Sequence, residues 1–170
     1  MIKKSVTELV GNTPLVQLDK LNKLENTQAT VFAKLEMFNP AGSVKDRIAK
    51  SMIEMAEKEG LLKEGSKIVE ATSGNTGIGL AAIGVSKGYE VIIVMPDTMS
   101  LERRKFVIGY GAKLVLTDGT LGMKGAIAKA LEMQAEDPLI FIPSQFENKA
   151  NVYAHYTTTG PEIDRDLDSK

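Results

Sequence analysis

Residues 69–80 read V-E-A-T-S-G-N-T-G-I-G-L, a short apolar run followed by a turn of polar and small residues. This pattern predicts a strand over 67–71 and a helix from about 76 to 87. The polar turn between them lies at the helix N-terminus, where backbone N–H groups lack intrahelical partners and negative charge is favoured. We therefore expect a small anion site here, and the size of the polar side chains favours a carboxylate.

Two other interpretations of this turn stay open at this point. In the first, Ser73 or Asn75 caps the helix and the glycines serve only the turn. In the second, residues 77–82 (Gly-Ile-Gly-Leu-Ala-Ala) form a dinucleotide-binding G-x-G-x-x-A motif. The glycines of that motif fall inside the predicted helix rather than at the turn where a pyrophosphate would need them. Titration with NAD tests the second interpretation, and we expect no binding.

The alternation of strand and helix continues along the chain. Predicted strands cover 90–95, 113–117 and 139–142, and predicted helices cover about 100–109 and 121–136. The first and last of these strands are almost wholly apolar, as expected for strands that helices cover on both faces. The sequence therefore predicts an α/β fold with a twisted parallel sheet and helices on both faces. Ligands of such sheets bind beyond the carboxyl ends of the strands, where the polar turn and residues 143–146 lie.

The chain on either side of this alternation is less regular. Residues 15–18 suit a short extended segment, and residues 30–36 alternate as a strand does. Ser43 with an aspartate three residues later is close to a capping box, so we expect a helix that begins there and ends at Gly60. Residues 148–160 have a helical pattern, after which the sequence becomes polar.

The composition of the 170-residue chain excludes several classes of site. It contains no cysteine, which excludes disulfides, thiolate nucleophiles and zinc–thiolate sites within it. His155 is the single histidine, so a multi-histidine metal site is impossible, and we expect no metal. A formal net charge of −1 gives no strong attraction to nucleic acid or membranes. No apolar run approaches the ~20 residues of a membrane span, and the N-terminus lacks the apolar core of a signal peptide, so we expect a cytoplasmic protein.

Lys45 and Gln145 are two further residues that could carry chemistry. Lys45 falls in the first turn of a predicted helix, where the helix dipole disfavours a cation. A desolvated lysine there would have a lowered pKa and could act as a nucleophile or base. The simpler interpretation is a solvated side chain beside an exposed Asp46–Lys50 pair. Gln145 follows a predicted strand, and it either offers its amide to a ligand at the sheet edge or is a surface turn residue.

Short motifs occur in order along essentially the whole chain. They are Gly11-Asn12-Thr13-Pro14-Leu15, Asn39-Pro40 with Ser43-Val44-Lys45-Asp46-Arg47, Thr72-Ser73-Gly74-Asn75-Thr76-Gly77, Pro96-Asp97-Thr98-Met99-Ser100-Leu101-Glu102-Arg103-Arg104, Gln145-Phe146-Glu147-Asn148 and Thr158-Thr159-Gly160-Pro161-Glu162-Ile163. Through them the sequence resembles the cysteine synthase (O-acetylserine sulfhydrylase) group of the fold-type II pyridoxal-phosphate family. The set in register is far more specific than any single motif, although Asp97 stands where the family usually has glutamate.

The resemblance implies a role for each candidate residue. Lys45 would hold pyridoxal 5′-phosphate as a Schiff base and move the α-proton of the substrate, and Asn75 would hydrogen-bond the 3′ oxygen of the cofactor. The implied reaction is β-replacement, in which sulfide displaces the acetoxy group of O-acetyl-L-serine to give L-cysteine and acetate. The residues implied in binding the amino-acid substrate, chiefly its α-carboxylate, are Thr72, Ser73, Asn75, Thr76 and Gln145.

The resemblance also implies how the chain divides. Residues 1–35 would belong to a large domain, residues 36–145 would form a small mobile α/β domain, and residues 146–170 would begin the return into the large domain. The chain would then cover about the N-terminal half of such an enzyme, and the loop that cradles the cofactor phosphate would lie beyond Lys170. We therefore expect a truncated form that binds the cofactor weakly and turns over little.

Two alternatives remain within the resemblance. Cystathionine β-synthase has the same polar loop, but residues 100–104 and the short N-terminus without a haem-binding extension favour cysteine synthase. A non-catalytic module is the other alternative, in which the loop binds the carboxylate-terminated peptide of serine acetyltransferase. The resemblance also implies a homodimer for the full-length protein.

Overall fold

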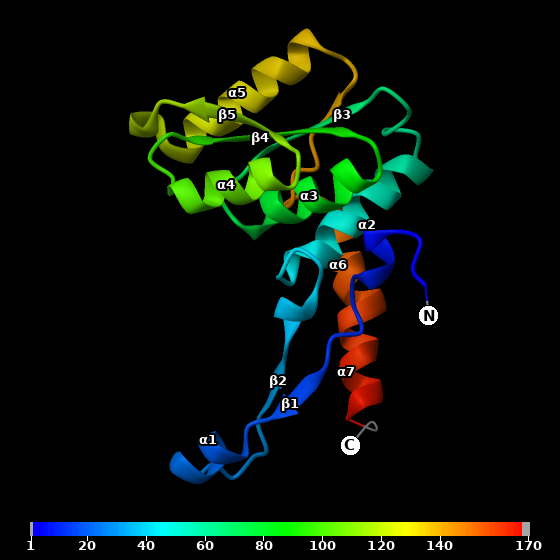
Figure 1. The fold of residues 1–170 in the computed structure, drawn as a ribbon, viewed down its shortest axis with the longest axis vertical. Helices are drawn as coiled ribbons and strands as arrows, with labels where there is room; N and C mark the ends of the chain where they lie inside the picture. Colours follow the sequence, from blue (N-terminus) through cyan, green and yellow to red (C-terminus); the bar gives the residue numbers. More distant parts are fainter. Residues whose placement is uncertain (1, 168–170) are drawn as a thin grey trace.

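The computed structural model describes residues 2–167, and Figure 1 shows an α/β body with an elongated extension below it. The body contains a four-stranded sheet in the order β5-β4-β3-β6, and all its strand pairs are parallel. Its strands are β3 (Lys67–Ala71), β4 (Glu90–Pro96), β5 (Lys113–Thr117) and β6 (Ile140–Phe141). Parallel neighbours require the chain to cross back between strands, and helices make these crossings.

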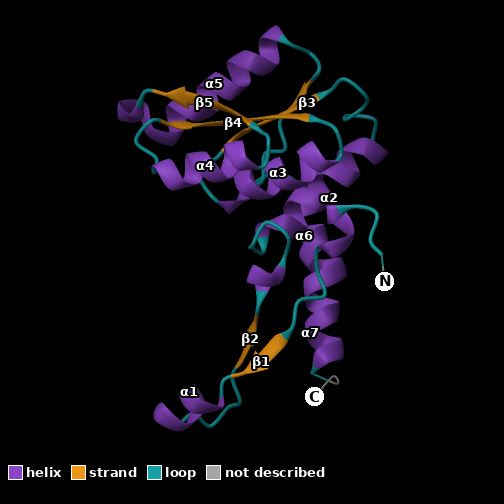
Figure 2. Ribbon diagram, in the orientation of Figure 1, coloured by secondary structure: helices purple, strands orange, loops and turns teal. Residues whose placement is uncertain are grey.

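Helices cover both faces of this sheet (Figure 2). On one face α5 (Gly122–Glu136) packs against Val69, Val94 and Ile140. On the other face lie α3 (Asn75–Ser86) and α4 (Leu101–Gly109), and α2 (Lys45–Lys58) packs against α3. The predicted α/β fold, with a parallel sheet between helices, is confirmed.

The side chains of β4 explain how one strand serves both faces. Val91, Ile93 and Met95 belong to the core shared with α2 and α3, whereas Ile92 and Val94 belong to the core shared with α5. Successive side chains of a strand point to opposite faces, so a strand covered on both sides is apolar at most of its positions.

The extension combines a two-stranded ribbon with a long helical rod, and the two lie side by side in Figures 1 and 2. The ribbon pairs β1 (Leu15–Gln17) with β2 (Phe32–Lys34) in antiparallel fashion, with α1 (Asp19–Leu24) in the connection. Short 3-10 turns precede and follow it at Val6–Leu9 and Glu36–Phe38. The rod consists of α6 (Lys149–Ala154), a π turn (His155–Thr159) and α7 (Gly160–Asp166).

Two predicted element bounds need correction. The helix expected over 148–160 continues to Asp166, because Pro161 falls in the first turn of α7, where a missing backbone N–H is tolerated. The strand expected over 30–36 is limited to Phe32–Lys34, where it has a partner strand on one side. Within residues 2–167, no helix combines the length and the apolar composition that crossing a membrane requires.

Candidate active site

The polar turn over residues 72–76 lies at the carboxyl end of β3 and the start of α3, as predicted. Gly74 is the N-cap of α3, and no side chain caps this helix. The alternative in which Ser73 or Asn75 caps the helix is therefore wrong. The Thr72 hydroxyl is buried and accepts the Gly74 N–H at 3.2 Å, while Asn75 is exposed at the first position of α3. The Ser73 hydroxyl and the Asn75 amide make no hydrogen bond to other described residues, so both remain available to a ligand.

Thr76 and Gln145 lie 69 positions apart in the chain and meet at this turn. The Thr76 hydroxyl donates to Oε1 of Gln145 over 2.5 Å, and both side chains are buried. The interpretation of Gln145 as a surface turn residue is therefore wrong. Because Oε1 accepts this hydrogen bond, the amide nitrogen keeps its two donors, and it has no acceptor among the described residues. An amide that presents N–H donors beside a helix N-terminus suits a carboxylate ligand.

Glu70 is a buried carboxylate next to these residues, and the sequence did not single it out. It lies on β3 and is 4% exposed, and its two oxygens accept the backbone N–H groups of Ser144 at 3.0 Å and Gln145 at 3.3 Å. Burial raises the pKa of Glu70, and the hydrogen bonds from the two N–H groups oppose that rise. In the sequence this residue is one charge within an apolar run, which gives no sign of its partners.

Lys45 is the first residue of α2 and lies against α3. A Cβ added at Gly79 would stand 3.2 Å from the Lys45 carbonyl oxygen, so the first turn of α2 touches α3 about one turn beyond Asn75. The Lys45 N–H donates to the Ser43 hydroxyl at 3.1 Å. The side chain is half-buried, and its amine makes no hydrogen bond or ion pair with other described residues. The lysine and the polar turn therefore lie at neighbouring helix starts on one side of the sheet.

The exposed Asp46–Lys50 pair that offered a simpler account of Lys45 does not form. Asp46 is fully buried, and it accepts the Ala41 N–H at 2.5 Å and the Ser43 hydroxyl at 3.3 Å. Burial raises the pKa of Asp46, although these hydrogen bonds oppose the rise. Lys50 instead donates to the Thr7 carbonyl at 3.0 Å. Asp46 thus holds the loop before α2 in place, and with it the start of the helix.

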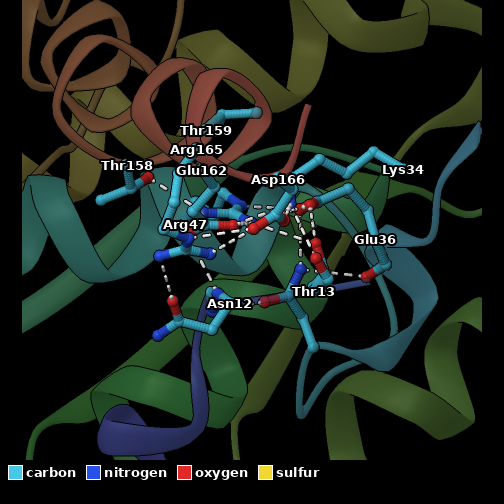
Figure 3. Close-up of polar contacts among 12 residues, drawn as sticks. Asn12, Thr13, Lys34, Glu36, Arg47, Thr158, Thr159, Glu162, Arg165 and Asp166 are labelled. Atoms are coloured by element: carbon cyan, nitrogen blue, oxygen red, sulfur yellow. Dashed lines mark hydrogen bonds and ion pairs between the residues drawn. The ribbon is translucent and has the colours of Figure 1, made fainter. Parts of the chain in front are cut away.

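Arg47, in the first turn of α2, is the centre of a buried ionic cluster (Figure 3). The Arg47 guanidinium is 3% exposed and makes paired hydrogen bonds to two carboxylates, Glu36 at 2.7 and 2.8 Å and Glu162 at 2.7 and 2.7 Å. Lys34 reaches the same Glu162 carboxylate at 2.9 Å, and the Asn12 N–H donates to it at 3.0 Å. The cluster therefore ties the ribbon and α7 to the helix that carries Lys45.

The cluster strongly favours the ionised form of the Glu162 carboxyl group. Burial alone would raise the pKa of the carboxyl group, but hydrogen bonds from Arg47, the Asn12 N–H and Lys34 outweigh burial and hold the pKa at about 2. The pKa of Glu36 is also lowered, because hydrogen bonds from Arg47, Thr13 and Asn39 outweigh the effect of its burial. Neither carboxylate was a sequence candidate, since buried and solvated charges look alike in a sequence.

His155 lies in the π turn, where Nδ1 is 2.9 Å from the Thr159 hydroxyl. Burial lowers the pKa of His155, and the positive charges of Lys45 and Arg47 lower it further, against a smaller opposing effect of Glu36. Among the described residues, no group of three or more acidic or histidine side chains could hold a metal ion.

Arg103 also contacts the polar turn. The guanidinium of Arg103, on α4, donates to the Ser73 carbonyl at 2.6 Å. Its neighbour Arg104 donates to the carbonyls of Met99 and Asp97 in the segment before α4. The two arginines thus link the polar turn and the start of α4 through backbone acceptors, which a residue pattern does not reveal.

Comparison with known proteins identifies relatives of this chain in sequence and in fold. The chain matches the family described as pyridoxal-phosphate dependent enzyme over residues 6–170. A cysteine synthase of Flavobacterium sp. is 53% identical over 164 residues, which are 96% of this chain and 52% of that protein. A cysteine synthase of Staphylococcus aureus is 52% identical over 166 residues, 98% of this chain and 53% of its own length. The chain therefore spans about half the length of the curated relatives it matches.

Solved structures agree with these relatives over the whole described fold. O-acetylserine sulfhydrylase isoform 3 from Entamoeba histolytica superposes with a TM-score of 0.93 at 46% identity, covering 99% of this chain and 51% of that one. A hydrogen sulfide-producing enzyme from Fusobacterium nucleatum gives a TM-score of 0.93 at 49% identity, covering 100% of this chain and 55% of that one. With fold, motifs and matches in agreement, the chain belongs to the pyridoxal-phosphate-dependent enzyme family and, within it, is similar to cysteine synthases.

Proposed function

We propose that this chain provides the lysine and the carboxylate-binding part of a cysteine synthase, which replaces the acetoxy group of O-acetyl-L-serine by sulfide. One observation carries the proposal. The start of α2, with Lys45, lies against α3 within about a turn of the polar residues at 72–76. One small amino acid could therefore meet an amine and a carboxylate site at the same time.

The residues present fit pyridoxal phosphate at its aldehyde end. The Lys45 amine is half-buried and has no partner among the described residues, so it is free to hold the cofactor covalently and then to carry the substrate α-proton. Asn75 is exposed at the start of α3, where its amide could donate to the cofactor 3′ oxygen. The bound cofactor supplies an electron sink for the carbanion formed at the α-carbon.

The carboxylate end of the substrate is proposed to bind at the start of α3. Thr76 and Gln145 are already joined there, and the Gln145 amide nitrogen keeps its N–H donors. Thr72 and Ser73 add hydroxyl groups on the preceding turn, and the helix N-terminus favours a negative charge. These groups would orient the substrate with its α-carbon toward Lys45.

The substrate pair is the finer part of the proposal. Relatives with this fold are named after different products. One of them is an O-ureido-L-serine synthase, which superposes with a TM-score of 0.90 at 43% identity. Assays of the full-length protein with O-acetyl-L-serine plus sulfide, against L-serine plus homocysteine, distinguish a cysteine synthase from a cystathionine β-synthase-like enzyme. Cytoplasmic location, a homodimer and binding of the serine acetyltransferase C-terminus stay predictions of the resemblance.

Trapping the cofactor on the 170-residue chain tests the proposal directly. The chain is incubated with pyridoxal phosphate, reduced with borohydride, digested and analysed by mass spectrometry. We expect one modified peptide that contains Lys45, and loss of that modification in Lys45→Ala, with Lys58→Ala as a matched control on the same helix. Modification spread evenly over surface lysines, or unchanged in Lys45→Ala, would contradict the assignment. Weak loading is expected, because no phosphate-binding loop is predicted within residues 1–170.

A further inference from the structure

Glu70 occupies a position where a parallel sheet ordinarily carries an apolar residue. β3 is an inner strand between β4 and β6, and the preceding side chains, Ile68 and Val69, are fully buried. Burying a carboxylate is unfavourable unless hydrogen bonds replace its water. No basic side chain among the described residues pairs with Glu70, and its partners are the N–H groups of Ser144 and Gln145. A charge kept in the core with these two partners points to a role other than packing.

The backbone that Glu70 holds is itself unusual. Ser144 has φ +53°, in the left-handed region that residues with a side chain seldom adopt. The Gln145 backbone is held from both sides, because Glu70 accepts from its N–H and Asn151 donates to its carbonyl at 2.8 Å. With both peptide groups held, the Gln145 side chain leaves the backbone toward Thr76, where Oε1 accepts the hydroxyl hydrogen bond at 2.5 Å.

We propose that Glu70 is a positioning residue for the carboxylate end of the substrate, acting through the backbone of residues 144–145. It does not touch the ligand. It holds the peptide groups before and after Ser144 so that the Gln145 amide stays against Thr76 with its N–H donors directed to a ligand. Through Glu70, strand β3 thereby also sets the position of Gln145, which faces the polar turn from the segment after β6.

Replacing Glu70 by glutamine tests this link, with Glu147→Gln as the matched control. Glutamine keeps the shape, but one of its two terminal groups is a donor, so one backbone N–H loses its acceptor. By NMR on the 170-residue chain, we expect amide hydrogen exchange at Ser144 and Gln145 to become about ten-fold faster or more. The nuclear Overhauser contact between the Gln145 amide and Thr76 should disappear. Glu147 is exposed in the same segment, and its variant should leave both signals unchanged.

A folded Glu70→Gln chain that keeps the Gln145–Thr76 contact overturns the proposal. A second measurement covers the case in which this variant does not fold. In the wild-type chain, acid protonates Glu70 and removes the same charge. The NMR chemical shift of the Gln145 side-chain amide should therefore change with pH at the same midpoint as the carboxyl signal of Glu70. The proposal is also overturned if the backbone amides of Ser144 and Gln145 titrate with Glu70 but the Gln145 side-chain amide does not. That result would limit the carboxylate to a structural role.

The ligand in this inference rests on the proposed function, and titration with O-acetyl-L-serine separates the two. Followed at the Thr76 amide, the wild-type chain should bind it saturably, Glu70→Gln about ten-fold more weakly or worse, and Glu147→Gln within two-fold. Equal affinity in wild type and Glu70→Gln contradicts the positioning role. No binding by the wild-type chain contradicts the carboxylate site itself, while the Gln145–Thr76 contact still decides the role of Glu70.

Discussion

His155, as the single histidine of the chain, gives a direct measure of the charge on Lys45. Besides burial, the positive charge of Lys45 is the largest influence that lowers the pKa of His155. We expect Lys45→Gln to raise this pKa, measured from the pH dependence of the imidazole proton signals in NMR. Lys58→Gln, an exposed lysine on the same helix, should leave it unchanged. A His155 pKa that is the same in both variants would mean that the ring does not sense Lys45.

The lowered pKa of Glu162 leads to a second prediction, which concerns how the free energy of unfolding depends on pH. Its pKa of about 2 in the folded chain lies below the ordinary value of 4.5, so its contribution is fully present above pH 4.5 and is lost as the pH falls toward 2. The shift corresponds to about 3 kcal/mol. Urea unfolding between pH 2 and 6 should show this loss in the wild-type chain and a flatter profile in Glu162→Gln. Glu64→Gln, an exposed carboxylate, should keep the wild-type profile.

Buried charges are also where prediction from the sequence was weakest. Lys45, Asn75 and Gln145 could be chosen because motifs and their places at strand or helix ends identify them. Glu70 and Arg47 could not, because the sequence shows a charge but not the backbone N–H groups or carboxylates that compensate it. Such partners come from segments far away in the chain, as in the pair Arg47–Glu162 with 115 positions between them.

At the scale of elements, the contact between α2 and α3 depends on a residue without a side chain. A Cβ at Gly79 would stand 3.2 Å from both the Lys45 carbonyl oxygen and the Ala49 Cβ, which is tighter than ordinary contact. We expect Gly79→Ala to lower the free energy of unfolding by about 1 kcal/mol or more, since the packed helices must separate. Gly109→Ala, in α4 with open space around it, should be neutral or stabilise by up to about 1 kcal/mol. Urea unfolding measures both, and a stable Gly79→Ala chain would contradict the close approach.

The regular elements were predictable because their signals are local. The almost wholly apolar strand β4, the apolar strand β6 and the glycines after the helices identify strand, helix and turn without any knowledge of tertiary contacts, as at Gly60 and Gly88 with positive φ. The continuation of the last helix through Pro161 was not predictable in the same way. It depends on Glu162 reaching Arg47, and that contact holds α7 in a polar stretch which alone gives little reason for a helix.

At the scale of the whole molecule, the body and the extension differ in how much each buries. The six residues of α1 include no buried residue, and the β1–β2 ribbon has two strands only, whereas β4 is buried at six of seven positions. A two-stranded ribbon is marginal by itself, so local opening should be easier there. We expect amides in β1 and β2 to exchange hydrogen about ten-fold faster or more than those of β4, measured by NMR or mass spectrometry. Equal protection would mean that the two parts unfold as one unit.

The ionic cluster around Arg47 has a consequence for the order of folding. The Asn12 N–H and the Glu162 carboxylate that it donates to are separated by 150 positions, so this contact cannot close until synthesis has passed Glu162 and α7 has left the ribosome. Pairing of β3 with β4 joins residues only 23 positions apart, as in Lys67 with Glu90, and this shorter loop closes at a smaller entropic cost. A nascent chain would therefore pair β3 with β4 before the Arg47 guanidinium gains Glu162 as a partner, and full dehydration of that charge would wait for α7 to dock.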